Sequence, residues 1–231
     1  MSKSPYPKRS MEEIEEAADE FSNIYFAATG RNLTAPIPVE DMAEHYLGYS
    51  IDLRDDGLFS DPEFLGGIDF DKNEIYVNVA IENHDGRYAF TVAHEIGHHV
   101  LHKEVYLKID GADEKQILCR DTGDKPHIEV EADRFAAALL MPSKAIQVAI
   151  SDLNTKHKVT TIGQARGLAN RLIKEAGFEN VSNTAMINRL IDLSFISNAI
   201  GYQDGKYNRN KRRPSFAWIL YKAIPALRKR C

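Results

Sequence analysis

Apolar positions near the start of the chain recur at helical spacing. Residues 11–29 place their apolar side chains on one face of a helix, which Gly30 would end. After a break at two prolines, residues 39–47 fit a short helix that ends at Gly48. The pattern therefore predicts two helices separated by a proline-containing turn.

The period of the pattern then changes from helical spacing to alternation. Residues 49–53 alternate apolar and polar side chains, as a half-buried strand does. Residues 64–70 and 74–78 are also strand-like, and the turn-forming tripeptide Asp-Lys-Asn lies between them at 71–73. We expect these two segments to pair as a hairpin beside the first strand.

Everything after Gly86 is helical in pattern, and Pro126 and Pro142 bracket one of the helices as a start and a stop. The predicted helices are residues 87–102, 127–141, 143–154, 161–176, 182–193 and 215–224. A small sheet followed by packed helices is typical of the α+β class. We therefore predict a small antiparallel or mixed sheet packed on a helical core, followed by a helical C-terminal region.

Composition narrows the class of protein without changing this picture. The chain has 231 residues, of which 43% are hydrophobic and 27% are charged, which excludes a disordered or collagen-like protein. Its two cysteines, Cys119 and Cys231, provide no disulfide framework and favour a reducing compartment. No apolar run approaches the ~20 residues of a membrane span, and the N-terminus lacks a signal peptide. We expect a cytoplasmic protein with no membrane span.

Charge is distributed unevenly along the chain. The last 26 residues, 206–231, carry nine basic side chains and no acidic one, whereas residues 1–205 have a net charge of −14. Such a split suggests an acidic or polyanionic partner and says little about fold. The aromatic part of this basic tail either packs as a terminal helix or contacts nucleic acid or an acidic membrane surface.

The segment that carries chemistry is His94-Glu95-Ile96-Gly97-His98. Two histidines four residues apart on a helix can direct both imidazoles at one cation, and Glu95 can reach a water bound to it. This is the HExxH arrangement of zinc hydrolases, in which the ion acidifies its water and the carboxylate takes the proton. Apolar residues between the histidines indicate that the helix is buried. The alternative is a buried helix whose histidines form only local hydrogen bonds.

A catalytic zinc needs a third protein ligand, and the best candidate is Glu129. It shares one helix face with small alanines and with Asp133, which could accept the outer N–H of a ligand imidazole. Glu131 competes for the ligand role, but it lies on a different face and is expected to form a surface ion pair with Arg134. His127 is a weaker rival, expected at the surface. A His2Glu site would also admit Mn²⁺ or another divalent ion.

The remaining histidines have less specific interpretations. His99 lies away from the ligand face and is expected to be exposed or locally bonded. His102 continues the face of the two motif histidines and could line the cleft, although its distance along the helix disfavours direct ligation. Isolated histidines elsewhere are expected to face solvent: His45, His84 and His157.

Two segments of the chain together resemble the ImmA/IrrE metallopeptidases, which are gluzincin-like HExxH enzymes. They are residues 87–102, RYAFTVAHEIGHHVLH, and residues 129–142, EVEADRFAAALLMP. Shorter similar pieces occur at 38–44, 65–71, 75–78 and 181–193, so the resemblance spans roughly residues 11–195.

The resemblance implies a zinc-dependent endopeptidase of bacteria or phage. Members cleave a helix-turn-helix repressor and thereby induce a mobile element or a stress response. Carried over, His94, His98 and Glu129 would be metal ligands and Glu95 the catalytic base. Many relatives have asparagine where this chain has Asp133, and either side chain can accept an imidazole N–H.

We divide the chain into an ImmA/IrrE-like metallopeptidase domain (10–142), a helical region with a helix-turn-helix-like segment (143–205) and the basic tail (206–231). The segment at 161–193 supports an alternative function, a DNA- or repressor-binding regulator without proteolysis. It contains four basic and three acidic residues, whereas a DNA-reading surface is normally more basic. Direct DNA contact is therefore the less favoured hypothesis.

Overall fold

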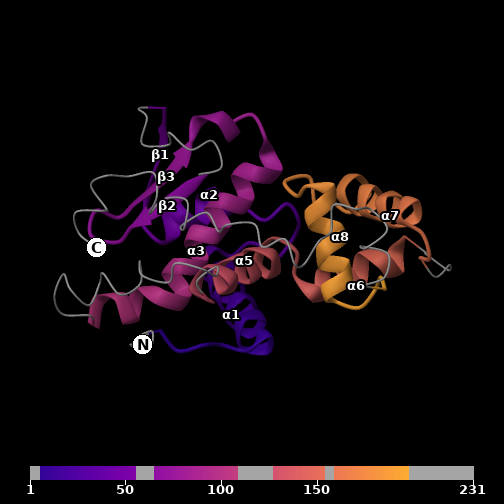
Figure 1. Ribbon diagram of the computed structural model, residues 1–231, viewed down its shortest axis with the longest axis horizontal. Helices are drawn as coiled ribbons and strands as arrows, with labels where there is room; N and C mark the ends of the chain where they lie inside the picture. Colours follow the sequence, from indigo (N-terminus) through magenta and orange to yellow (C-terminus); the bar gives the residue numbers. More distant parts are fainter. Residues whose placement is uncertain (1–5, 56–64, 109–126, 154–158, 198–231) are drawn as a thin grey trace.

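The computed structural model describes residues 6–55, 65–108, 127–153 and 159–197. In chain order its elements are α1 (Met11–Thr29), α2 (Val39–Asp41), the π-helical η1 (Met42–Tyr46), β1 (Ser50–Arg54), β2 (Gly66–Asp69), β3 (Glu74–Asn78), the 3-10 turn η2 (Val79–Ile81), α3 (Asp85–Lys108), α5 (His127–Leu140), α6 (Ser143–Asp152), α7 (Ile162–Glu175) and α8 (Asn183–Asp192) (Figure 1). This mixture confirms the predicted α+β class.

Local sequence signals account for where the helices begin and end. Ser10 caps α1 by accepting a hydrogen bond from the backbone N–H of Glu13, whose carboxylate accepts the N–H of Ser10 in return. Thr161 and Gln164 form the same reciprocal cap on α7. Gly30 ends α1 with φ 67°, a left-handed conformation that glycine adopts without steric cost.

The sheet has three strands in the order β1-β3-β2. β2 and β3 are antiparallel, with Asp69 opposite Glu74 next to the turn, which confirms the predicted hairpin. β1 pairs with the other edge of β3 in parallel register, from Ser50 opposite Glu74 to Arg54 opposite Asn78. The sheet is therefore mixed, as the sequence pattern allowed.

Helix α3 is the central element of the body. It contacts β2 and β3 on one side and α5 on the other, and α5 in turn packs against α1 (Figure 1). Large side chains that are fully buried in this core include Tyr25, Ile75, Ile96, Phe135 and Leu139. The half of α3 that carries the motif is thus enclosed between the sheet and α5.

Gly97 allows α3 and α5 to approach closely. A Cβ at this position would lie 3.2 Å from each of three atoms of α5: Cα and O of Ala132 and Cβ of Phe135. Few real Cβ atoms have contacts this short. A side chain at Gly97 would push α5, and the residues that it carries, away from α3.

Gly97→Ala is expected to lower the free energy of unfolding by about 1–3 kcal/mol, because overpacking outweighs the better helix propensity of alanine. The matched control is Gly167→Ala in α7, where an added Cβ would meet no neighbouring side chain or element within 4 Å. This control should raise the free energy by about 0.5–1 kcal/mol. Urea unfolding monitored by circular dichroism measures the free energy of unfolding of both variants. An equal increase in Gly97→Ala and Gly167→Ala would contradict the close packing at Gly97.

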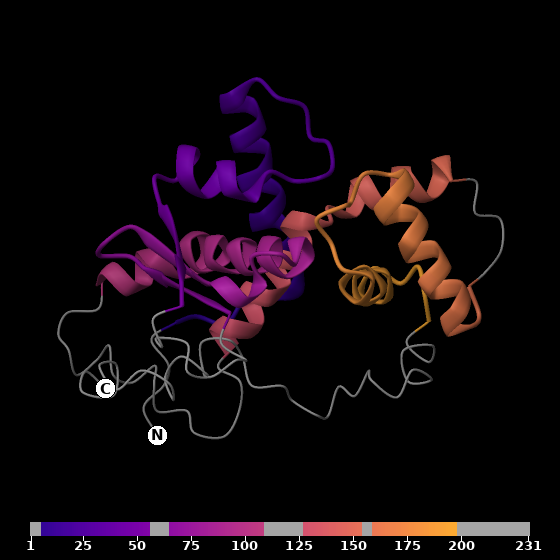
Figure 2. The ribbon, with the colours of Figure 1, turned by 90° about the horizontal axis from the view of Figure 1, so that it is seen from above.

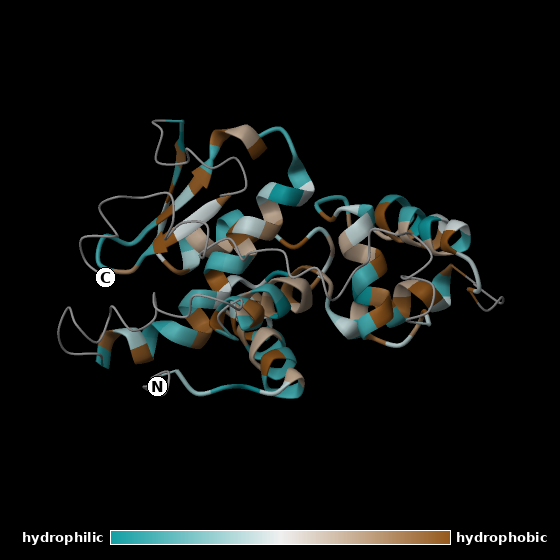
Figure 3. Ribbon diagram, in the orientation of Figure 1, coloured by the Kyte–Doolittle hydropathy of each residue, from teal (hydrophilic) through white to brown (hydrophobic). Residues whose placement is uncertain are grey.

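Helices α6, α7 and α8 form a lobe beside this body, as the two ribbon views show (Figures 1 and 2). Hydrophobic and hydrophilic residues alternate along each of them (Figure 3). Arg189 of α8 is buried and connects the lobe to the body: its Nε donates to the carbonyl of Met141 at 2.9 Å, and its guanidinium pairs with Glu15 of α1.

Most predicted bounds agree with the structure to within two residues, and α3 differs most. It begins at Asp85 and continues to Lys108, beyond the predicted end at residue 102. The extra turns are held by an ion pair between Lys108 and Glu104 and by packing of Tyr106 on Phe70. The predicted helix at 215–224 and the basic tail lie outside the described residues. Among the described helices, none has the length and apolar character needed to cross a membrane.

Candidate metal centre

The motif residues lie on the enclosed part of α3. His94, Glu95 and His98 are 2%, 3% and 8% exposed, so water reaches them very little. Glu129, in the first turn of α5, is also 2% exposed and faces the two histidines across the helix interface. Four polar side chains are therefore buried together in the core, where each needs a hydrogen-bond or charge partner.

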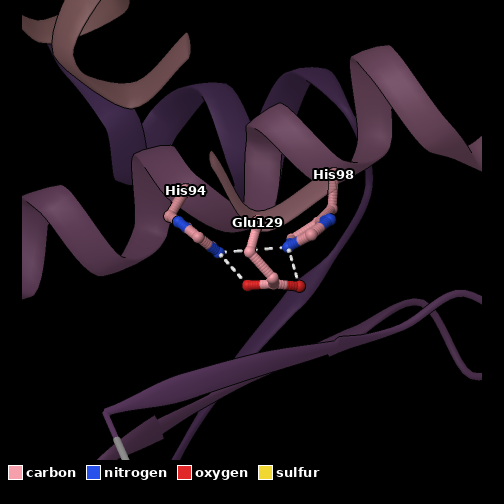
Figure 4. A group of neighbouring side chains, drawn as sticks. All are labelled: His94, His98 and Glu129. Atoms are coloured by element: carbon pink, nitrogen blue, oxygen red, sulfur yellow. Dashed lines mark hydrogen bonds and ion pairs between the residues drawn. The ribbon is translucent and has the colours of Figure 1, made fainter. Parts of the chain in front are cut away.

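Three of these side chains converge on one point (Figure 4). Nε2 of His94 lies 3.0 Å from Nε2 of His98 and 3.2 Å from Oε2 of Glu129. Nε2 of His98 lies 3.3 Å from Oε1 of the same carboxylate. Glu95 is not one of the three converging groups.

The donor set fits a divalent metal ion. In a tetrahedral zinc site with bonds of ~2.1 Å, neighbouring ligand atoms are about 3.4 Å apart. The shortest distances between the three donor groups are 3.0 to 3.3 Å, and one ligand atom from each residue lies within 4.8 Å of the other two. Three protein ligands leave a further position for water or substrate, as catalytic rather than structural zinc sites do. His94, His98 and Glu129 could therefore bind a metal.

The electrostatics of the cluster favour a positive charge at its centre. Burial by itself would lower the pKa of His94, but hydrogen bonds to Asp133 and Glu129 outweigh it and raise that pKa to about 10. Burial likewise opposes ionisation of Glu129, yet the neighbouring His98 and His94 hold its pKa well below the usual range. A pKa above neutrality means that the protonated form of His94 is favoured at pH 7.

Metal binding is therefore expected to release about one proton at pH 7, because His94 must be deprotonated to act as a ligand. Since its pKa is about 10, the apparent affinity should rise about tenfold per pH unit between pH 6 and 9. Calorimetric titration of zinc in buffers of different ionisation enthalpy measures the release. Asp133→Asn should release less, and binding without proton release by the unaltered protein would contradict this electrostatic account.

Asp133 lies one turn beyond Glu129 on α5 and contacts the outer nitrogen of a candidate ligand. Its Oδ1 is 2.9 Å from Nδ1 of His94. With its proton on Nδ1, His94 can therefore donate a hydrogen bond to the carboxylate. Its Nε2 lone pair is then directed at the cluster centre. This is the contact that the shared face of α5 predicts.

Glu95 lies beside the cluster, close to strand β2. Burial raises the pKa of Glu95, while His94 and His98 act to lower it. A Cβ placed on Gly66 of β2 would lie 3.5 Å from Oε1 of Glu95 and would clash with Thr91 at 2.3 Å. Gly66 therefore lets the strand backbone pack directly against α3 at this carboxylate. The paired glycines within a predicted strand are the sequence signal for such a close approach.

A comparison with protein-family models identifies the family of the chain. Residues 37–172 match the model described as the IrrE N-terminal-like domain, Peptidase_M78. The chain belongs to the Peptidase_M78 family. The match covers more than half of the sequence and includes both α3 and α5, so the family resemblance is confirmed and a peptidase is indicated. Comparison with curated proteins gives no significant match.

The prediction for Glu131 is wrong. Glu131 was expected at the surface with Arg134, but its side chain is only 4% exposed and it pairs with Arg9 and His102. The helix face was assigned correctly as different from that of Glu129. That face is covered by the N-terminal segment, which lies far away in the sequence.

The other histidines of the M78 domain have partners that their positions in sequence did not show. His99 is half-buried, and its Nδ1 lies 2.8 Å from the hydroxyl of Tyr49, so the expectation of an exposed or locally bonded side chain is wrong. His127 is also half-buried, with Nε2 3.1 Å from the carbonyl of Tyr6. His45 and His84 are exposed as expected, and His157 lies outside the described residues.

Proposed function

We propose that this protein is a zinc-dependent endopeptidase whose metal ligands are His94, His98 and Glu129 and whose general base is Glu95. The observation that carries the proposal is the convergence of two imidazole nitrogens and one carboxylate within 3.3 Å of one another, next to a further buried carboxylate. The M78 family supports the peptidase class. Mn²⁺ or another divalent ion would fit the same donors.

Different residues of the chain have different roles in the proposed reaction. When bound, a divalent ion polarises the scissile carbonyl and lowers the pKa of a bound water. Glu95 accepts the proton of the attacking water as the C–O bond forms, as a general base does. Glu95 then donates this proton to the leaving nitrogen as the C–N bond breaks. Asp133 holds His94 in the tautomer that leaves Nε2 free for the metal.

For the substrate we propose a helix-turn-helix transcriptional repressor, whose cleavage would derepress a mobile element or a stress response. The support is the family resemblance together with charge: residues 1–205 carry a net charge of −14, which suits a basic, DNA-binding protein as partner. We place the reaction in the cytoplasm, where such a repressor meets its DNA.

The substrate proposal is tested with a repressor encoded next to the gene for this protein. We expect the zinc-loaded protein to convert the purified repressor into two fragments, which mass spectrometry assigns to one peptide bond. A basic DNA-binding protein of similar size without helix-turn-helix character is the control. Equal cleavage of both, or cleavage of neither, would contradict the substrate class.

The alternative function, a DNA-binding regulator, gains no support from the helical lobe. Of the basic residues in its helix-turn-helix-like segment, Arg189 is buried against Glu15, and Arg171 pairs with Glu175. The segment therefore offers DNA fewer basic side chains than its sequence suggests. Direct DNA contact stays an untested and less favoured prediction.

A further inference from the structure

A buried chain of polar side chains begins at the outer nitrogen of His98. Nδ1 of His98 lies 3.1 Å from Nδ1 of His102, one turn further along α3. Nε2 of His102 lies 3.3 Å from Oε2 of Glu131 on α5. His102 and Glu131 are 2% and 3% exposed, so neither is a surface residue that meets the other by chance.

The chain of contacts ends at the N-terminal segment that precedes α1. Glu131 accepts the backbone N–H of Arg9 at 3.0 Å and its Nη1 at 3.2 Å. Nη2 of Arg9 also donates to the carbonyl of Leu101 at 2.6 Å, which fixes the guanidinium against α3. The buried carboxylate is thus neutralised by an arginine that lies outside the matched domain, residues 37–172.

Only one arrangement of protons satisfies these contacts when His98 is a ligand through Nε2. His98 must then be protonated on Nδ1, and this N–H donates a hydrogen bond to Nδ1 of His102. His102 must be protonated on Nε2, and this N–H donates a hydrogen bond to the carboxylate of Glu131, which also accepts hydrogen bonds from Arg9. Each donor has one acceptor, and each buried charge has its counterion.

The two candidate imidazole ligands are therefore supported differently. The outer nitrogen of His94, Nδ1, contacts the carboxylate of Asp133 directly, at 2.9 Å. The outer nitrogen of His98 is connected to a carboxylate, that of Glu131, only through His102. Tyr6 closes the outer end of this path, because its ring packs edge-on against His102 with centroids 5.7 Å apart. The N-terminal segment thus forms the outer wall behind His98.

We propose that His102, Glu131 and Arg9 are positioning residues that fix the tautomer and orientation of His98, and so make the N-terminal segment part of the metal centre. This inference rests on the proposed metal centre. Disturbing any member of the path should weaken metal binding and alter the geometry around the ion. Loss of a partner that orients a metal-ligating histidine typically lowers metal affinity by about 10–100-fold.

The test compares Co²⁺ and Zn²⁺ binding by the full-length protein and its variants. Affinity is measured by competition with a chromophoric chelator, and the visible spectrum of bound Co²⁺ reports the ligand geometry. We expect Glu131→Gln and His102→Leu to lower the affinity about 10–100-fold and to change the Co²⁺ spectrum. Arg9→Met should do the same to a smaller extent, and Arg9→Lys should recover part of the loss by restoring the positive charge.

The matched control is Arg31→Met, because Arg31 also pairs with a carboxylate, that of Asp41, away from this path. It should leave both affinity and spectrum unchanged. If His102→Leu does not fold, the metal affinity and Co²⁺ spectrum of Glu131→Gln test the inference, because this substitution keeps the size of the side chain and the packing of the helix. Folded path variants with the affinity and spectrum of the unaltered protein would overturn the inference while leaving the metal centre intact. Failure of the unaltered protein to bind metal would instead overturn the proposed function.

Discussion

Glu95→Gln is expected to lower kcat for repressor cleavage by about 10²–10⁴-fold, the range that a general base contributes. Glutamine has the shape of glutamate and can still form hydrogen bonds, but it cannot accept the proton of the attacking water. Glu95 is not one of the three converging donors, so metal affinity should change little. Gel-based cleavage rates and a metal titration on the same preparation measure both effects.

The matched control for this variant is Glu104→Gln, which changes an exposed glutamate of the same helix. Glu104 pairs with the neighbouring Lys108 at the surface, away from the cluster, and the rate should stay unchanged. If Glu95→Gln cleaves the repressor at the unaltered rate, Glu95 is not the base. If it loses metal together with activity, its role is in the metal site instead.

Removing a metal ligand is the second change with a large expected effect. His98→Ala and Glu129→Ala should each lower zinc affinity by more than about 100-fold, because loss of a direct bond exceeds the loss of an orienting partner. Cleavage at limiting zinc should fall with the affinity. Competition with a chelator of known affinity measures the change.

His99→Ala provides the control, since His99 is adjacent to His98 in sequence but contacts Tyr49 instead of the cluster. Its zinc affinity should equal that of the unaltered protein. An unchanged affinity in Glu129→Ala would show that the third ligand is another residue. A loss in His99→Ala comparable to that in His98→Ala would mean that the effect comes from damage to α3 in general.

The arrangement of the candidate ligands could be predicted because it depends on helix periodicity. The spacing of His94 and His98 places them on one face of any helix, and Glu129 shares its face with Asp133 and with small residues that allow close packing. The structure has α3 and α5 in contact along these faces, with Gly97 at a close approach. Local rules were sufficient here, since each prediction concerned one helix and the face it buries.

The path behind His98 could not be predicted in the same way. Periodicity separates the face of Glu131 from that of Glu129, but it does not say what covers that face. For Glu131 on a surface helix, the expected partner is the nearest basic residue in sequence, Arg134. The observed partner, Arg9, precedes Glu131 by more than a hundred residues. Contacts between distant segments depend on tertiary packing, which a single helix pattern does not contain.

Under the proposed function, hydrolysis requires one metal ion held by His94, His98 and Glu129. The most direct measurement is a titration of the metal-free protein with zinc while repressor cleavage is followed. Activity is expected to rise linearly and to reach a plateau at one zinc per chain, and His94→Ala is expected to show no such rise in the same zinc range. Cleavage by the metal-free protein at the full rate, or an identical titration curve for His94→Ala, would show that hydrolysis does not depend on this metal centre.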